Sequence, residues 1–441
     1  MYKYFANALV VNEGREEYIN ILTKGNRIEV LSKEPLSDLP LGAEYVECKG
    51  LILIPGVIDA HVHFRQPGME YKADMRSESM AAIAGGVTTV LEMPNTKPAT
   101  TNSECLEEKL SLAKENMCCN YGFFFGLTND NYEQAREISA EKSCGLKLFL
   151  GSSTGNMLVN DRKVLDKIFS ITDRLISAHC EDEDIIKDNI IRYKALYSDK
   201  ATADLHPLIR STEACFKSSS FAVSMAKEHG TRLHIAHLST EKEISLLQSG
   251  DVSTKRITAE VSPIHLWFDA MDFAEYGNRI KCNPSVKTEN DKAALRRALR
   301  EDKIDIIATD HAPHTWEEKQ KPYFEAPSGV PSIQHSLLVM LQLVKQGELS
   351  LCKMVEKMAH NPAKLFDIKG RGYIKKGYFA DFVLINPNEK TEVTNSSLLS
   401  KCKWSPFEGK IFDNKIVATY LNGEKVFENG RILDCRKAMK I

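Results

Sequence analysis

The sequence lacks long hydrophobic runs and an excess of either charge. No stretch approaches the 18 or so consecutive apolar residues that a transmembrane helix needs. The 58 basic and 60 acidic side chains give a formal net charge of −2, which argues against a nucleic-acid partner attracted by excess positive charge. We therefore expect neither a membrane nor a nucleic acid as partner, and a homo-oligomer stays open.

Paired cysteine motifs are also missing. The eleven cysteines are scattered without a CxxC motif, and only Cys118 and Cys119 are adjacent. This usage favours the reduced thiols of a cytosolic protein. Residues 1–5 lack the basic-then-apolar pattern of a signal peptide. We expect a cytoplasmic location.

The long middle of the chain alternates two kinds of segment. Apolar strand candidates lie at 51–58, 87–93, 121–126, 145–150, 174–179, 232–237, 257–261 and 304–310. Helix-like amphipathic candidates lie at 74–84, 103–116, 131–140, 161–169, 210–229, 240–248, 290–300 and 331–346. Eight strands alternating with helices are typical of an α/β fold of the (β/α)₈, or TIM-barrel, type.

The two ends of the chain have a different pattern. Short segments of alternating apolar and polar residues occur near both termini, and Asn422 and Gly423 form a hairpin-turn signal between two of them. We therefore expect residues 1–54 and 370–441 to form one small composite β-sandwich domain. Residues 55–369 would then form the barrel.

Two histidines separated by one residue, His61 and His63, follow the first barrel strand. Strand side chains alternate, so both rings project from one side and can hold a divalent metal ion. The motif is weak alone, but active sites of such barrels lie at the carboxyl ends of the strands. Those ends carry four more ligand-type residues: Lys147 within the fourth strand, and His179, His237 and Asp310 ending the fifth, sixth and eighth.

Lys147 is the unusual member of this set. A dication would repel an ammonium group, and burial favours the neutral amine. A neutral amine can add carbon dioxide and become a carbamate that bridges two metals; the alternative is an ion pair with Asp310 or another carboxylate. Four histidines, a bridging carboxylate and an aspartate suit two ions about 3.5–4 Å apart. Zinc fits these ligands best, although other transition metals accept them too.

Substrate-binding candidates occur at the same strand ends. Arg65 keeps the parity of the two histidines and could grip a carboxylate through two hydrogen bonds. Asn95 and Asn283 follow the second and seventh strands and could donate and accept hydrogen bonds. His314 lies in the loop 312–329, which could cover the site. The alternatives are a surface ion pair for Arg65 and plain turn roles for both asparagines.

Five further histidines are expected to have no role in the chemistry. His234 sits inside its strand, whereas His237 ends it. No chemistry is assigned to the helical or loop histidines His206, His229, His335 and His360.

Four motifs carry a resemblance to a known family. They are Asp59-Ala60-His61-Val62-His63-Phe64-Arg65-Gln66-Pro67-Gly68, Met93-Pro94-Asn95-Thr96-Lys97-Pro98, Cys282-Asn283-Pro284 and Thr309-Asp310-His311-Ala312-Pro313-His314. Together they resemble the dihydroorotases of the amidohydrolase superfamily, in their long class with a composite sheet domain. The likeness covers essentially the whole chain, including the Glu317-Glu318-Lys319 motif. The chain departs from the family pattern at two places. Ile264 stands where many relatives have a histidine, and residues 329–334 differ from the Gly-Leu-Glu sequence that usually ends the loop after the eighth strand.

The resemblance implies a ligand set, an activity and further contacts. It implies two divalent metal ions, held by the six residues above and bridged by carboxylated Lys147 and hydroxide. It implies substrate contacts at Arg65, Asn95, Asn283 and His314, with backbone groups near Ser328 and Gly329.

The reaction it implies is the reversible cyclisation of N-carbamoyl-L-aspartate to L-dihydroorotate in pyrimidine biosynthesis, with Asp310 as the catalytic proton carrier. The alternatives are a hydantoinase or allantoinase, which share the metal ligands, and a non-catalytic scaffold.

Overall fold

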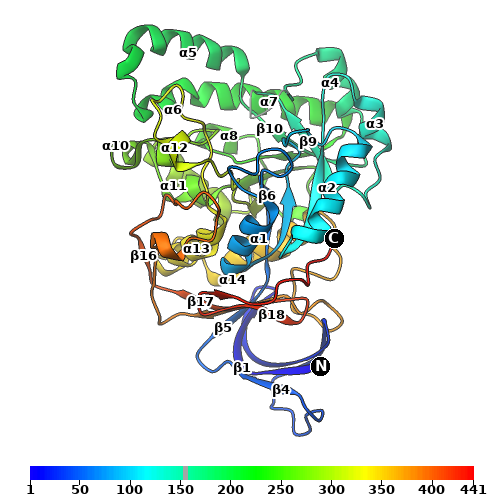
Figure 1. Cartoon of the computed structure of the whole chain (residues 1–441). Helices are drawn as coiled ribbons and strands as arrows, with labels where there is room; N and C mark the ends of the chain where they lie inside the picture. Colours follow the sequence, from blue (N-terminus) through cyan, green and yellow to red (C-terminus); the bar gives the residue numbers. More distant parts are fainter. Residues whose placement is uncertain (152–156) are drawn as a thin grey trace.

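The computed structural model describes residues 1–151 and 157–441 (Figure 1). Eight parallel strands follow one another in a single sheet, and a bridge between Val62 and His311 joins its two edges into a barrel. The strands are β6 (Val57–Val62), β7 (Val87–Glu92), β8 (Asn120–Gly126), β9 (Gly145–Phe149), β10 (Leu175–His179), β11 (Arg232–Ile235), β12 (Ile257–Val261) and β13 (Ile306–Ile307). The predicted TIM-barrel fold is confirmed.

Helices surround the barrel (Figure 1). Those that match predicted segments are α1 (Met75–Ala84), α2 (Ser103–Asn116), α3 (Tyr132–Glu137), α4 (Arg162–Phe169), α7 (Thr212–His229), α8 (Glu241–Ile244), α11 (Glu289–Arg300) and α13 (Ser336–Lys345). Further helices are α5 (Glu183–Tyr197), α6 (His206–Ile209), α9 (Pro263–Trp267), α10 (Phe273–Tyr276), α12 (Trp316–Lys319), α14 (Leu351–Val355) and α15 (Asn361–Leu365). Polar side chains begin many of them: Asp74, Ser211 and Thr288 accept hydrogen bonds from first-turn backbone N–H groups.

The predicted first strand, 51–58, is in fact parts of two strands. Strand β5 (Ile52–Pro55) belongs to another sheet, and β6 begins after Gly56. A Cβ at Gly56 would lie 2.1 Å from Oγ1 of Thr88, so only glycine allows this close approach. His61 therefore lies within β6, not after it, and His63 follows the strand directly.

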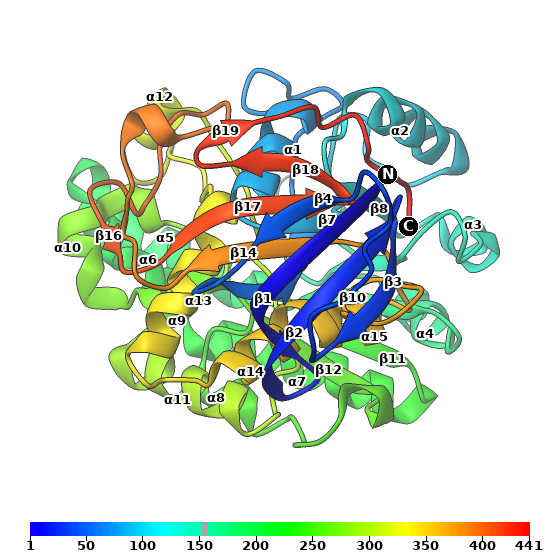
Figure 2. The ribbon, with the colours of Figure 1, turned by 90° about the horizontal axis from the view of Figure 1, so that it is seen from below.

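Strands from both ends of the chain form one nine-stranded sheet, which Figure 2 shows in the foreground. The members besides β5 are β1 (Tyr2–Asn12), β2 (Arg15–Lys24), β3 (Arg27–Ser32), β4 (Glu44–Glu47), β14 (Phe382–Asn386), β17 (Lys415–Leu421), β18 (Glu424–Glu428) and β19 (Arg431–Ile432). Antiparallel pairing of β5 with β14 joins the two ends. The ring of Phe5 packs 5.3 Å from that of Phe382 and 4.9 Å from that of Tyr420, centroid to centroid.

This sheet confirms the composite arrangement of the termini. The Asn422–Gly423 turn connects β17 and β18 as predicted. A short pair, β15 (Thr391–Glu392) and β16 (Ile411–Phe412), lies between β14 and β17 in sequence. The exact domain bounds, 1–54 with 370–441 and 55–369, stay a prediction.

One expectation about cysteines is wrong. Cys118 and Cys435 are joined in a disulfide, with Cα atoms 4.9 Å apart, which links the segment before β8 to the C-terminal segment. The other nine cysteines are free thiols. Within the described ranges, no helix has both the length and the apolar character needed to span a membrane.

Candidate metal centre

The first group of predicted ligands meets where the barrel closes. Nε2 of His63 lies 3.0 Å from Oδ1 of Asp310, and Nε2 of His61 lies 3.4 Å from the same oxygen. One ligand atom from each of the three residues lies within 4.8 Å of the others. The Asp310 side chain keeps 16% exposure, against 9% for that of His63 and 1% for that of His61, so its carboxylate is the most accessible group of this trio.

The second group comes from the neighbouring strands β10 and β11. Nδ1 of His179 lies 3.0 Å from Nε2 of His237. The ring of His237 is 5.3 Å from that of His61, centroid to centroid, and the ring of His61 is 5.3 Å from that of His63. The four rings therefore form one continuous row, which we call the histidine row: His63, His61, His237 and His179.

Lys147 completes the predicted set from strand β9. It is fully buried, and its Nζ has no hydrogen-bond partner among the described residues. Burial lowers the pKa of Lys147 to about 8, although the negative charges of Glu260 and Asp310 act in the opposite direction. The alternative ion pair between Lys147 and Asp310 is not formed in the described part of the chain. A buried, unpartnered amine of this kind suits carbamate formation.

Three rings of the row have an oxygen beside the nitrogen that faces away from the cluster. Nδ1 of His61 is hydrogen-bonded to Glu260, Nδ1 of His63 lies 2.8 Å from Oδ1 of Asn95, and Nε2 of His179 lies 3.0 Å from Oε2 of Glu181. An acceptor at one ring nitrogen fixes the proton there and leaves the other lone pair free for a metal. Burial also lowers the pKa of His63 to about 4, and it lowers the pKa values of His179 and His237, which favours the neutral form of these three rings. This donor set fits divalent metal ions.

Glu260 and Glu181 were missed in the sequence. Glu260, on β12, also lies 3.1 Å from Nε2 of His234 and accepts a hydrogen bond from the backbone N–H of His237. Burial would raise the pKa of Glu260, but His61 and His234 hold it well below its usual value. Glu181 is also fully buried and pairs with Arg210. A carboxylate inside the apolar run 257–261 was the available sequence signal for Glu260.

Three of these residues adopt backbone conformations that L-amino acids rarely take. The φ angles are 68° at Arg65, 35° at His237 and 49° at Asp310. Each follows a barrel strand, and such left-handed conformations carry a local energetic cost. Their concentration at one rim marks this rim as the functional end of the barrel.

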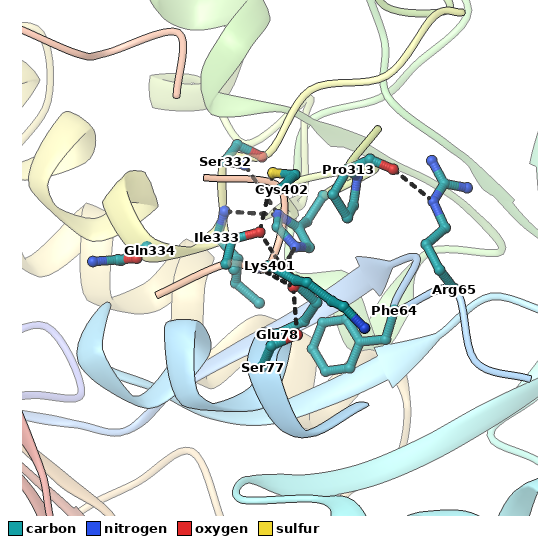
Figure 3. Close-up of polar contacts among 12 residues, drawn as sticks. Phe64, Arg65, Ser77, Glu78, Pro313, Ser332, Ile333, Gln334, Lys401 and Cys402 are labelled. Atoms are coloured by element: carbon teal, nitrogen blue, oxygen red, sulfur yellow. Dashed lines mark hydrogen bonds and ion pairs between the residues drawn. The ribbon is translucent and has the colours of Figure 1, made fainter. Parts of the chain in front are cut away.

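Arg65 is buried, with 2% exposure, so its alternative role in a surface ion pair is wrong. Its Nε donates to the carbonyl of Pro313 at 2.9 Å (Figure 3), and its Nη2 lies 3.1 Å from Nε2 of His314. Nδ1 of His314 lies 2.9 Å from Nζ of Lys72, while its Nε2 lies 3.0 Å from the carbonyl oxygen of Ser328. Burial, followed by the charge of Arg65, lowers the pKa of His314 to about 3, so the ring is neutral.

The side chain of Asn283 contacts His206, a histidine for which the sequence predicted no role in the chemistry. Nε2 of His206 lies 2.8 Å from the carbonyl oxygen of Cys282 and 3.1 Å from Oδ1 of Asn283, and its Nδ1 lies 2.9 Å from the hydroxyl of Tyr323. His206 therefore orients the Asn283 amide.

Gly329 packs closely against His314. A Cβ at Gly329 would lie 2.8 Å from the ring of His314, so this close packing requires glycine.

A further buried network supports the loop that carries Asp310. Nε2 of His311 lies 2.8 Å from Oε2 of Glu78, and its Nδ1 accepts a hydrogen bond from the backbone N–H of Ser332 at 3.0 Å. Glu78 also accepts a hydrogen bond from the Ser400 hydroxyl. It accepts another from the backbone N–H of Lys401, which lies beside it in Figure 3. The segment at 400–401 is thereby connected, through Glu78 of helix α1, to His311, the residue after Asp310.

Comparison with known proteins agrees with this geometry. The amidohydrolase family model matches residues 52–426. The chain belongs to the amidohydrolase family. This amidohydrolase is 32% identical to the dihydroorotase of Methanothermobacter thermautotrophicus over 95% of its own chain and 93% of that protein. It is 33% identical to the dihydroorotase of Halobacterium salinarum over 87% and 92% of the two chains. The predicted resemblance is confirmed.

Solved structures give the same fold. The L-hydantoinase of Arthrobacter aurescens superimposes with a TM-score of 0.92 at 26% identity, covering 98% of both chains. The dihydropyrimidinase of Brevibacillus agri gives a TM-score of 0.90 at 21% identity, covering 100% of this amidohydrolase and 98% of that chain. The second likeness concerns the fold alone.

The rim combines two chemical capacities. One is a buried set of imidazoles and carboxylates suited to metal ions, and the other is a buried guanidinium beside the neutral ring of His314. Such a rim can bring metal ions and a cationic group that binds anions close together.

Proposed function

We propose that this amidohydrolase is a dihydroorotase, which interconverts N-carbamoyl-L-aspartate and L-dihydroorotate. The observation that carries the proposal is the buried Arg65, two residues after His63 and bonded to Pro313 beside His314. A buried guanidinium next to a reacting centre suits a substrate with a carboxylate, and the ring of dihydroorotate carries one. Similarity to curated dihydroorotases over nearly the full chain supports the same activity.

The proposed cofactor is a pair of divalent metal ions, zinc by ligand preference. His61, His63, His179, His237 and Asp310 would hold them, with carboxylated Lys147 as the bridging ligand. Supporting observations are the facing nitrogens of His179 and His237 and the amine of Lys147, which has no hydrogen-bond partner in the described part of the chain. When bound, the ions polarise the carbonyl group and lower the pKa of water to the neutral range.

The chain's own residues would complete the reaction. In the hydrolytic direction, Asp310 takes the proton of the attacking water and delivers it to the leaving ring nitrogen. In the biosynthetic direction it removes the ureido proton. Arg65, with Asn283 and the Asn95 amide, fixes the substrate carboxylate and ring, which orients the reacting carbonyl. His314 and the backbone near Ser328 and Gly329 would close the same end of the site.

A cyclic-amide hydrolase of the hydantoinase type is the second candidate, because the L-hydantoinase likeness spans both chains. Hydantoin itself has no carboxylate for Arg65 to bind. The test is turnover of dihydroorotate, hydantoin and allantoin by the purified chain, with metal content measured on the same sample. Faster turnover of hydantoin or allantoin than of dihydroorotate would reject the proposal, and a metal-free, inactive chain would favour the scaffold alternative.

The biological setting is proposed with the activity. Dihydroorotate formation belongs to pyrimidine biosynthesis, and we propose a cytoplasmic enzyme with this role. A homo-oligomer stays a prediction, which light scattering on the purified chain would test.

A further inference from the structure

Lys319 ends helix α12 in the loop after β13, and its ammonium group is buried with 2% exposure. Its Nζ donates to three backbone carbonyls, those of Lys281 at 3.2 Å, Pro327 at 3.0 Å and Gly329 at 3.0 Å. The cation also lies 5.6 Å from the centroid of the Trp404 ring. None of these contacts is with a carboxylate, so the amine of Lys319 binds backbone oxygens here.

A second buried lysine, Lys281, lies in the other loop and binds carbonyls of the loop that carries Lys319. Nζ of Lys281, in the loop after β12, donates to the carbonyls of Tyr323 and Ala326 at 2.6 Å each. The backbone N–H of Gly329 donates to the carbonyl of Lys281 at 2.9 Å. The two loops are thus tied in both directions, and we call this arrangement the lysine clasp (Lys281 and Lys319). Burial lowers the pKa of each lysine to about 7. The charge of Arg210 lowers the pKa of Lys281 further, and the charge of Lys281 lowers that of Lys319.

The clasp is connected to the substrate end of the site. Lys319 holds the carbonyls on either side of Ser328, and the Ser328 carbonyl itself accepts from His314. The carbonyl of His314 accepts from Nε1 of Trp404 at 2.7 Å, on the ring beside Lys319. His314 in turn contacts Arg65. A continuous series of contacts therefore runs from Nζ of Lys319 through His314 to Arg65, whose Nε also donates to the carbonyl of Pro313, the residue before His314.

We propose that Lys319 is a positioning residue, whose ammonium sets the path of the backbone at 327–329 and so holds His314 against Arg65. Its effect on substrate binding rests on the proposed function, whereas its effect on the loop does not. Because this side chain makes three hydrogen bonds to the backbone of the two loops, its loss should loosen the loop while the histidine row stays intact.

The test compares Lys319→Met with Lys321→Met, a change at an exposed lysine of the same loop. Lys319→Met should raise the KM for dihydroorotate about tenfold or more, with kcat lowered less and bound zinc unchanged. Amide hydrogen exchange in 326–332 should accelerate without any substrate present. Lys321→Met should match the wild type in each measurement.

A double-mutant cycle then separates positioning from general stability. In a His314→Ala background, Lys319→Met should produce little further rise in KM, because the effect passes through that ring. Additive effects, or unchanged exchange in 326–332, would overturn the proposal. If Lys319→Met does not fold, Lys281→Met tests the clasp from the other loop with the same measurements. Wild-type protein that does not turn over dihydroorotate would instead reject the proposed function, and the exchange result would still decide the clasp.

Discussion

The carboxylate of Glu260 is hydrogen-bonded to Nδ1 of His61, and so connects strand β12 to strand β6 across the inside of the barrel. The same carboxylate contacts His234 and the backbone of His237. One buried negative charge therefore orients two residues of the histidine row. Acceptors in this position raise ligand basicity and fix the ring orientation.

Glu260→Gln should weaken metal binding about 10–100-fold, because the neutral amide no longer stabilises the protonated Nδ1 of His61. Competition with a chelating dye measures the affinity. Glu243→Gln is the matched control, since Glu243 is equally buried but accepts from the hydroxyls of Ser219 and Thr240. Equal metal affinity in Glu260→Gln and the wild type would contradict the assigned role.

Lys147→Ala should lose metal, because the bridging carboxylate can no longer form. Small carboxylic acids such as acetate or propionate should restore part of the metal content and activity, since they offer two oxygens in the vacated space. Elemental analysis and dihydroorotate turnover measure both. Full metal retention in Lys147→Ala, without any response to added acid, would rule out a bridging role.

Metal loading should depend on pH through Lys147. With a pKa of about 8, about one amine in ten is neutral at pH 7, against roughly one in 3,000 at the ordinary value near 10.5. Only the neutral amine adds carbon dioxide. The pKa of His63, lowered by burial to about 4, leaves that ligand neutral above pH 6.

The rate at which chelator-treated protein recovers activity with zinc, at fixed dissolved carbon dioxide, should therefore rise about tenfold from pH 6 to 7 and level off above pH 8. Acid-rescued Lys147→Ala serves as the control and should show no such rise. A flat profile for the wild type would contradict carbamate formation on Lys147.

Much of the barrel was predictable because its strands are short apolar runs separated by amphipathic segments. The rim was predictable for the same reason, since His179, His237 and Asp310 end such runs. The split at Gly56 was not, because β5 and β6 are both buried and read as one apolar segment. Helix α5 was missed although Ile186, Ile190, Tyr193 and Tyr197 recur at helical spacing. Of its residues, Ile186 is the one that is buried.

The missing parts of the site depend on contacts between distant segments. Glu260 acts on His61, 199 residues away in sequence, and no local pattern reports such a pairing. Cys118 and Cys435 are separated by 317 residues, and spacing alone cannot pair cysteines. His206 looked like an ordinary helical histidine, yet the loop after β12 brings Asn283 to it.

Asp310→Asn should abolish turnover while the fold is retained. The amide cannot accept the proton of the attacking water, and its neutral group binds metal more weakly. Circular dichroism and thermal unfolding check the fold, and dihydroorotate hydrolysis checks the activity. Asp305→Asn, at the other end of the same strand region and bonded to Lys255, is a control for removing a buried carboxylate there. Residual turnover within tenfold of the wild type would remove Asp310 from the catalytic role.

Arg65→Met decides whether the substrate is held by its carboxylate. The guanidinium is buried beside His314 and Pro313, so a carboxylate bound to it would be shielded from water and would contribute about 2–5 kcal/mol. Methionine keeps the length of the side chain without its charge, and we expect the KM for dihydroorotate to rise about 30-fold or more with bound zinc unchanged. Arg279→Met, which removes an arginine bonded to the carbonyl of Glu275, should leave KM as it was. An unchanged KM in Arg65→Met would show that the carboxylate binds elsewhere, and the preference for dihydroorotate over hydantoin would then need another source on the rim.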